Sequence, residues 1–176
     1  MIPVLLAIAV LVILLIVVIA GQPDEFKVAR SAAIAATPQK VFSHVNELRK
    51  WEDWSPWAKL DPDAKSAFEG PDSGVGSAMS WSGNRKVGEG KMTITESAPA
   101  SFIQFRLEFL RPFKATNTAE FVFAPRGDQT SVTWSMAGKN NFMGKVFSLF
   151  FNCDTMVGKD FEKGLARLKA VAEAGK

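Results

Sequence analysis

Three charged residues lie in step with apolar neighbours and are the candidates for chemistry in this sequence. Arg30 and Glu96 each follow an apolar residue by two positions in alternating stretches, and Asp154 borders an apolar helical stripe. A charged group that faces a protein interior must be paired or must shift its pKa. Two interpretations stay open. The three residues form an internal salt bridge or reach water at strand ends, or they serve as polar anchors for a ligand headgroup or as an acid–base pair. We assign no catalytic residue.

The sequence contains one cysteine, Cys153, and one histidine, His44. A single cysteine forms no intramolecular disulfide, and one cysteine with one histidine cannot complete a zinc site built from these ligands. Gly88-Glu-Gly90 lacks the strand-to-helix context of a phosphate-binding turn and is more simply part of a hairpin. We therefore predict no metal and no cofactor, and we expect His44 to be a structural or surface residue.

The first 23 residues carry no charged side chain, and residues 4–20 are an unbroken apolar run. A helix of about 20 residues is long enough to cross a hydrocarbon core of about 30 Å. We predict that residues 1–23 form a single-pass transmembrane anchor with a short linker, and a cleaved signal peptide is the alternative. Basic residues follow the span and none precedes it, which favours a cytoplasmic location for the domain.

Residues 24–176 are predicted to form one domain of the α+β class. Alternation over residues 26–34 predicts a strand, and Thr37-Pro38 predicts the start of a helix, because a hydroxyl residue caps helices and proline suits the first helical position. Later alternating stretches separated by turn residues predict an antiparallel meander with one apolar face. Apolar residues recur at three- and four-residue steps over 146–171. This spacing predicts one long C-terminal helix that covers the sheet.

Trp51, Trp54 and Trp57 place three of the five tryptophans within a short segment. Because Pro56 prevents a long regular helix there, the spacing of three gathers the rings on one side of a short turn. We predict a satellite packing cluster that closes one end of the core. A ligand-facing aromatic wall is the alternative.

Fourteen Phe and five Trp with no Tyr indicate an interior with few phenolic groups to hydrogen-bond. These rings either pack a solid core or line an apolar pocket. The predicted pocket is lined by inward positions of strands and of the C-terminal helix: Trp81, Phe105, Phe109, Phe121, Trp134, Val157 and Phe161. Gly158 and Gly164 each cost that helix about 1 kcal/mol relative to Ala. Close approach of the sheet or of a ligand would explain them.

Several segments, in the right order, resemble a known family over residues 24–173. They are residues 26–41, Trp54-Ser-Pro-Trp57, Trp81-Ser-Gly-Asn84, and residues 88–96, 112–118 and 132–145. The sequence resembles the START-like, helix-grip superfamily, and within it the polyketide cyclase/dehydrase-type (SRPBCC) proteins. The resemblance implies a curved antiparallel sheet that grips a long C-terminal helix, with a cavity between them for lipids or other apolar molecules.

We therefore predict a membrane-anchored domain that binds a lipid or another hydrophobic small molecule between the sheet and the C-terminal helix. The first alternative is a cyclase- or dehydratase-like enzyme, which requires a cavity carboxyl with a raised pKa at Glu96 or Asp154. The second is a membrane-tethered protein-interaction module that presents exposed tryptophans from residues 51–57. Nucleic-acid binding is not expected, because basic residues are interspersed with acidic ones and no aromatic–basic strand motif is present.

Overall fold

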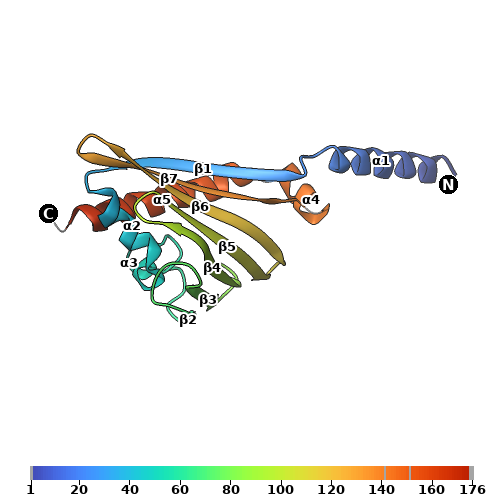
Figure 1. The fold of residues 1–176 in the computed structure, drawn as a ribbon. Coiled ribbons are helices and arrows are strands. Elements are labelled where there is room, and N and C mark those ends of the chain that lie inside the picture. Colours follow the sequence, from blue (N-terminus) through green and yellow to red (C-terminus); the bar gives the residue numbers. More distant parts are fainter. Residues whose placement is uncertain (1, 141, 151, 175–176) are drawn as a thin grey trace.

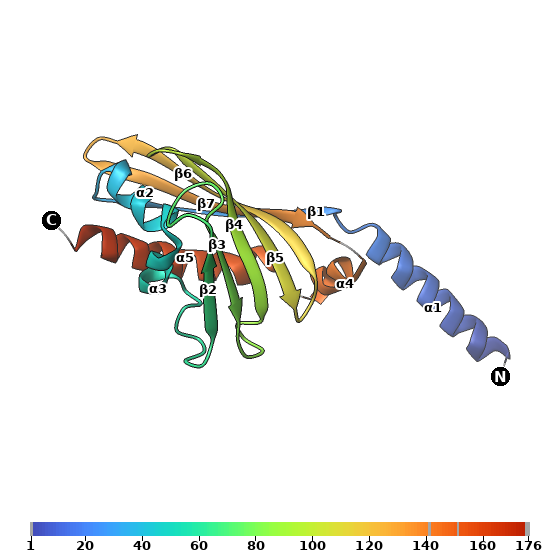
Figure 2. The same cartoon turned by 60° about the horizontal axis from the view of Figure 1, so that its bottom comes forward.

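The computed structural model describes residues 2–140, 142–150 and 152–174. A seven-stranded antiparallel sheet curves around a long C-terminal helix, which confirms the α+β helix-grip prediction (Figure 1 and Figure 2). The helices are α1 (Ile2–Ala20), α2 (Pro38–Asn46), α3 (Trp51–Trp54), α4 (Phe142–Phe150) and α5 (Cys153–Glu173). The strands are β1 (Glu25–Ile34), β2 (Lys65–Glu69), β3 (Ala78–Ser82), β4 (Glu89–Ala98), β5 (Phe102–Arg111), β6 (Ala115–Arg126) and β7 (Gln129–Lys139).

The strands stand in the order β1-β7-β6-β5-β4-β3-β2. Strands that follow one another from β2 to β7 are therefore neighbours, and β1 closes the sheet beside β7. The predicted alternation is seen directly on β7, where every second side chain from Thr130 to Met136 is buried. Helix α5 lies against this buried face through Phe161, Leu165 and Leu168. The sequence period thus identified the inner face of the sheet.

The tryptophan segment lies in the core instead of at its edge. Trp51 and Trp54 on α3 are buried, and Trp57 is partly buried. Their indole N–H groups are satisfied locally, because Trp51 donates to the carbonyl oxygen of Val45 at 2.9 Å and Trp54 donates to that of His44 at 3.1 Å. The Trp51 ring then packs on the sheet aromatics. The prediction of packing is confirmed, but the cluster is central and not a satellite.

The predicted long C-terminal helix is two helices. Helix α4 ends at Phe150 and α5 begins at Cys153. Asn152 has an extended backbone (φ −81°, ψ 102°), and its side chain accepts a hydrogen bond from the backbone N–H of Thr155 at 3.0 Å. This is an N-cap, and it satisfies a donor at the start of a helix that has no intrahelical partner. The apolar periodicity continued across the break, so the spacing alone did not reveal it.

A bulge in β4 changes the face on which Glu96 lies. Ile94 pairs with Phe105, but Glu96 pairs with Gln104, so Thr95 is an extra residue in the ladder. An extra residue shifts every later side chain to the opposite face. Glu96 is consequently exposed on the outer face. Its predicted position in step with Ile94 was wrong for this reason.

Helix α1 leaves the body of the domain. It is 19 residues long, and among the described residues it is the one helix whose length and composition would allow it to cross a membrane. Over 18 residues of α1 the mean hydropathy is 3.6, and only 6% of this stretch is buried within the protein. An amphipathic core helix would bury one stripe, whereas α1 is apolar on all sides and buries only Ile19.

Candidate ligand-binding site

The interface between the sheet and α5 has a closed part that aromatic rings fill. Trp134 of β7 and Phe161 of α5 stack with ring centroids 4.0 Å apart and planes 8° from parallel. The Phe121 ring stacks on Trp134 with centroids 4.9 Å apart, and the Phe105 ring packs edge-on to Phe121 at 6.1 Å. All four rings are buried. These predicted pocket residues therefore contact one another, and no space for a ligand separates Trp134 from Phe161.

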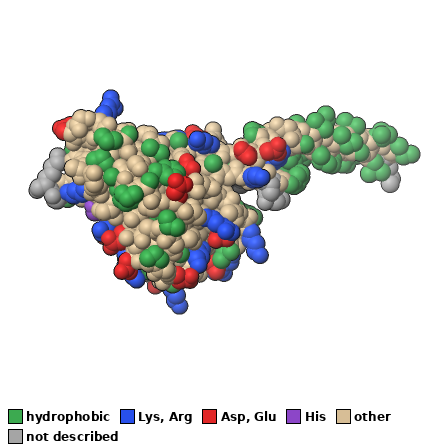
Figure 3. Space-filling model, in the orientation of Figure 1, with side chains coloured by type: hydrophobic (Ala, Val, Ile, Leu, Met, Phe, Trp, Pro, Cys, Tyr) green, Lys and Arg blue, Asp and Glu red, His purple; other side chains and the backbone are tan. Residues whose placement is uncertain are grey.

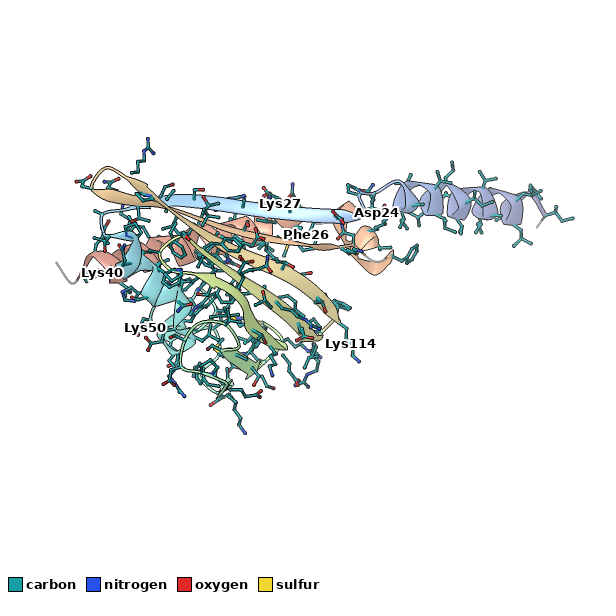
Figure 4. The ribbon with its side chains drawn as sticks, in the orientation of Figure 1. Asp24, Phe26, Lys27, Lys40, Lys50 and Lys114 are labelled. Carbon is teal, nitrogen blue, oxygen red and sulfur yellow. The ribbon has the colours of Figure 1, made fainter. Side chains whose placement is uncertain are left out.

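The same interface has an open part toward the start of α5. Here inward positions stay partly accessible to solvent: Phe26, Met79, Trp81, Leu107, Phe109, Cys153 and Val157. Figure 4 shows Phe26 on the opposite side of β1 from Lys27, which points outward. Burial raises the pKa of the Cys153 thiol, so that this side chain is a neutral lining group near neutral pH. Of the seven predicted pocket residues, Trp81, Phe109 and Val157 lie here.

Trp81 and Phe109 meet across a glycine of the strand between them. Their rings are 6.0 Å apart in an edge-to-face arrangement. Gly90 on β4 pairs with Trp81 on one side and with Phe109 on the other. A Cβ atom at Gly90 would lie 2.5 Å from the Trp81 ring and 2.5 Å from the carbonyl oxygen of Glu108. Because Gly90 has no side chain, the indole of Trp81 can lie flat on the sheet, which enlarges the apolar surface of the open part.

Two surface hollows lie at opposite ends of the sheet in the described part of the chain. The larger has a volume of about 370 Å³ and lies at the β5–β6 hairpin end, beside the open part: Glu108, Phe109, Leu110, Lys114, Ala115 and Thr116 line it. The smaller, about 30 Å³, lies at the other end of the sheet near Leu48 and Phe68. Only the larger hollow is of the size that small-molecule sites have, and it contains one of the predicted lining residues, Phe109.

Arg30 and Asp154 are brought together, and Glu96 is not. Arg30 lies on the inner row of the sheet, paired with Trp134. Its guanidinium donates to both carboxylate oxygens of Asp154 at 2.9 and 3.0 Å, and its Nε donates to Glu162 at 2.8 Å. These hydrogen bonds hold the pKa of Asp154 below its usual value and raise that of Arg30. The arrangement is a salt bridge that ties β1 to α5.

The geometry gives no support to an acid–base pair. A general acid at neutral pH needs a raised pKa, whereas Asp154 has a lowered one and its side chain is 55% exposed. Glu96 is exposed on the outer face, away from the α5 side of the sheet. Within the described residues, no group of three or more His, Cys, Asp or Glu side chains is placed to hold a metal ion.

Asn117 is a polar group of the inner face that the sequence analysis missed. It is buried on β6, between Leu107 on β5 and Gly138 on β7. Its amide donates a weak hydrogen bond to the sulfur of Met136 at 3.8 Å. A Cβ atom at Gly138 would lie 2.8 Å from the Asn117 Cγ, so the amide rests on that glycine. Extending the β6 alternation one step back from Ala119 would have identified it.

The comparisons with known proteins agree with this architecture. The family model described as "Polyketide cyclase / dehydrase and lipid transport" matches residues 25–173. CV1439 from Chromobacterium violaceum is 14% identical with a TM-score of 0.60, and the match covers 86% of this chain and 99% of that one. Aha1 from Colwellia psychrerythraea is 18% identical with a TM-score of 0.58, over 86% and 98% of the two chains.

The third relative in structure is a two-domain protein. BexL, a di-domain ARO/CYC protein from the BE-7585A biosynthetic pathway, is 14% identical with a TM-score of 0.63, and the match covers 92% of this chain and 54% of BexL. At such identities the likeness shows a common fold. No curated relative matches the sequence. The family match spans the whole domain that follows α1, and the chain therefore belongs to the polyketide cyclase/dehydrase and lipid-transport family.

Proposed function

We propose that the protein binds a lipid or another apolar small molecule between the sheet and the first half of α5, and that α1 anchors it in a membrane. The supporting observation is the contrast within one interface. Around Trp134 the inward side chains are buried and stacked, whereas around Trp81, Phe109 and Val157 they stay accessible. Apolar side chains that remain accessible in a concave site are typical of ligand pockets.

Three further features support this proposal. The hollow of about 370 Å³ lies at Phe109. The description of the family includes lipid transport. An apolar ligand partitions into the bilayer, so a membrane anchor would give the site a high effective ligand concentration at that surface.

The polar anchor that we propose in this site is Asn117. Arg30 and Asp154, the anchors expected from sequence, already satisfy each other, and Glu96 lies on the outer face. The Asn117 amide borders the open part through its neighbour Leu107 and has a weak sulfur partner. A ligand headgroup would offer it a stronger one.

The test is ligand capture by the full chain in mild detergent. We expect native mass spectrometry to detect a co-purified lipid, or titration with fluorescent fatty acids, sterols and quinones to saturate. Val157→Trp should fill the open part and abolish uptake. Val122→Trp is the matched control, because Val122 is exposed on the outer face of β6. Circular dichroism would verify that both variants fold. Absence of any saturable uptake by the unaltered protein would refute the proposal.

The interaction-module alternative has less support. It required exposed tryptophans at residues 51–57, but Trp51 and Trp54 are buried and pack on the sheet, and Trp57 is partly buried. Truncating either ring would perturb the core and not a docking surface.

A further inference from the structure

The last turn of α1 is fastened to α4. Ile19 is the residue of α1 that becomes buried, and α1 and α4 are in contact. Lys145, the single charged residue of α4, donates to the carbonyl oxygen of Ala20 at 3.3 Å and pairs with Asp24 at 2.6 Å. A lysine that hydrogen-bonds the last carbonyl of a helix satisfies an acceptor without an intrahelical partner. Helix α4 thus lies directly at the domain end of α1.

The β5–β6 turn lies at the same end of the sheet as α4 and the last turn of α1. Strand β1 starts at Glu25, which pairs with Lys139 at the end of β7, and the adjoining start of β6 follows the β5–β6 turn. In an antiparallel sheet, the start of β1, the end of β7 and the β5–β6 turn therefore lie at the same end of the strands. Figure 1 and Figure 2 both show α4 and the β5–β6 turn at the end of the domain from which α1 leaves, and Figure 4 places Lys114 there.

This end of the domain exposes aromatic and basic side chains together. Phe113 in the turn is 68% exposed and Phe142 at the start of α4 is 59% exposed. Phe113 is flanked by exposed Leu110, Arg111 and Lys114. Figure 3 shows the apolar surface of α1 and, where it meets the domain, both acidic and basic side chains. Exposed apolar rings beside lysine and arginine are typical of segments that lie in the headgroup region.

We propose that α4 and the β5–β6 turn (residues 110–114) form a membrane-contact surface that rests on an anionic bilayer at the foot of α1. If α1 spans the membrane, its domain end lies at the headgroups, and α4, in contact with that end, lies there too. Lys114 supplies positive charge for lipid phosphates, whereas the Arg111 guanidinium pairs with Glu89. The inference rests on the proposed anchoring and deepens it, because Leu110 and Lys114 also line the larger hollow. The ligand site would then open onto the bilayer surface.

The test places fluorescent labels along the full chain. On a Cys153→Ser background, single cysteines carry an NBD label at Phe113→Cys, Phe142→Cys, Val75→Cys or Val12→Cys. Val75 is exposed in the β2–β3 turn at the opposite end of the strands, and Val12 lies in the middle of α1. The protein is reconstituted in vesicles of phosphatidylcholine with phosphatidylglycerol that contain nitroxide lipids.

We expect shallow nitroxides to quench the labels at 113 and 142, deep nitroxides to quench the label at 12, and neither to quench the label at 75. If the label at 12 is quenched but the labels at 113 and 142 behave like the label at 75, the contact surface is refuted and the membrane anchor is not. No quenching at 12 would overturn both. Quenching at 113 and 142 without ligand uptake by the unaltered protein would overturn the proposed ligand binding alone.

A charge reversal tests the anionic part of the inference. Lys114→Glu should reduce quenching at 113 in vesicles that contain phosphatidylglycerol and change it little in pure phosphatidylcholine. Lys40→Glu is the matched control, since Figure 4 shows Lys40 at the far end of the domain. Equal effects of the two reversals would overturn the role of Lys114.

Discussion

The guanidinium of Arg30 occupies the space where a side chain at residue 158 would begin. A Cβ atom on Gly158 would lie 2.8 Å from Nε of Arg30 and closer still to Cζ and Nη2. Asp154 and Glu162, one helical turn before and after this glycine, accept the hydrogen bonds of Arg30. The missing side chain therefore lets β1 reach across α5. This explains a glycine that costs the helix about 1 kcal/mol.

Replacing Gly158 with alanine should destabilise the protein despite the better helix propensity of alanine. The Cβ atom displaces Arg30, so both ion pairs break. In an Arg30→Ala background the space is empty, and the same Gly158→Ala change should stabilise the protein by about 1 kcal/mol. Urea unfolding of the four proteins in this double-mutant cycle measures the change in sign. A stabilising effect in both backgrounds would show that Arg30 does not occupy this space.

Replacing Gly164 with alanine tests the closed part of the interface. The new Cβ atom would lie 2.7 Å from the Trp134 ring and 3.1 Å from Cδ of Pro56. Overpacking of a filled core typically costs about 1–3 kcal/mol, so the free energy of unfolding should fall by that amount. Ala166→Ser, at an exposed position of the same helix, should change it by less than about 0.5 kcal/mol. A neutral Gly164→Ala would mean that Trp134 can move away from α5.

His44 should make stability depend on pH. Burial, followed by the charges of Lys50 and Lys40, lowers its pKa below the ordinary value of 6.5, and its Nδ1 is buried with no partner among the described residues. Because the folded state binds this proton less tightly than the unfolded state, the stability is complete above about pH 6.5 and falls as the pH drops below that value.

Urea unfolding near neutral pH and near pH 5.5 measures this dependence. The unaltered protein should lose more stability across the interval than His44→Gln, which cannot titrate. Equal losses in the two proteins would contradict a depressed pKa at His44.

Substitution of Asn117 should weaken binding of ligands that carry a polar headgroup. Asn117→Leu removes the amide from the inner face but keeps a side chain of similar size. Loss of one hydrogen bond of about 1–1.5 kcal/mol lowers affinity about tenfold. A fluorescent fatty acid should show this loss, whereas a hydrocarbon probe such as pyrene should bind as before. Glu96→Gln on the outer face is the control, and if it matched Asn117→Leu, the assignment of the anchor would fail.

Local patterns in the sequence were enough to predict the class of fold. Alternation with period two identified the inner face of β5, β6 and β7, and Thr37-Pro38 marked the start of α2, where the Thr37 hydroxyl accepts from the backbone N–H of Lys40. Apolar character without a stripe distinguished α1 from a core helix. These features depend on near neighbours along the chain, so a period or a cap residue is sufficient to predict them.

The candidate site depended on contacts between distant segments. Periodicity assigned Phe105 and Phe109 to the same face, but the rings of Trp51, Trp134 and Phe161 fill the space near the first and leave the second accessible. The bulge at Thr95 arises from pairing with β5, so the period of β4 alone placed Glu96 on the wrong face.

The two ends of the chain show the same difference between what the sequence predicts and what only folding decides. The length and apolar character of α1 and the apolar stripe of the C-terminal segment follow from the order of residues. That Arg30 passes over Gly158, and that Lys145 joins α4 to the end of α1, follows only from folding, because these partners are separated by more than a hundred residues. Sequence periodicity reports which face a side chain takes, whereas the space in front of that face is set by whatever other segment packs there.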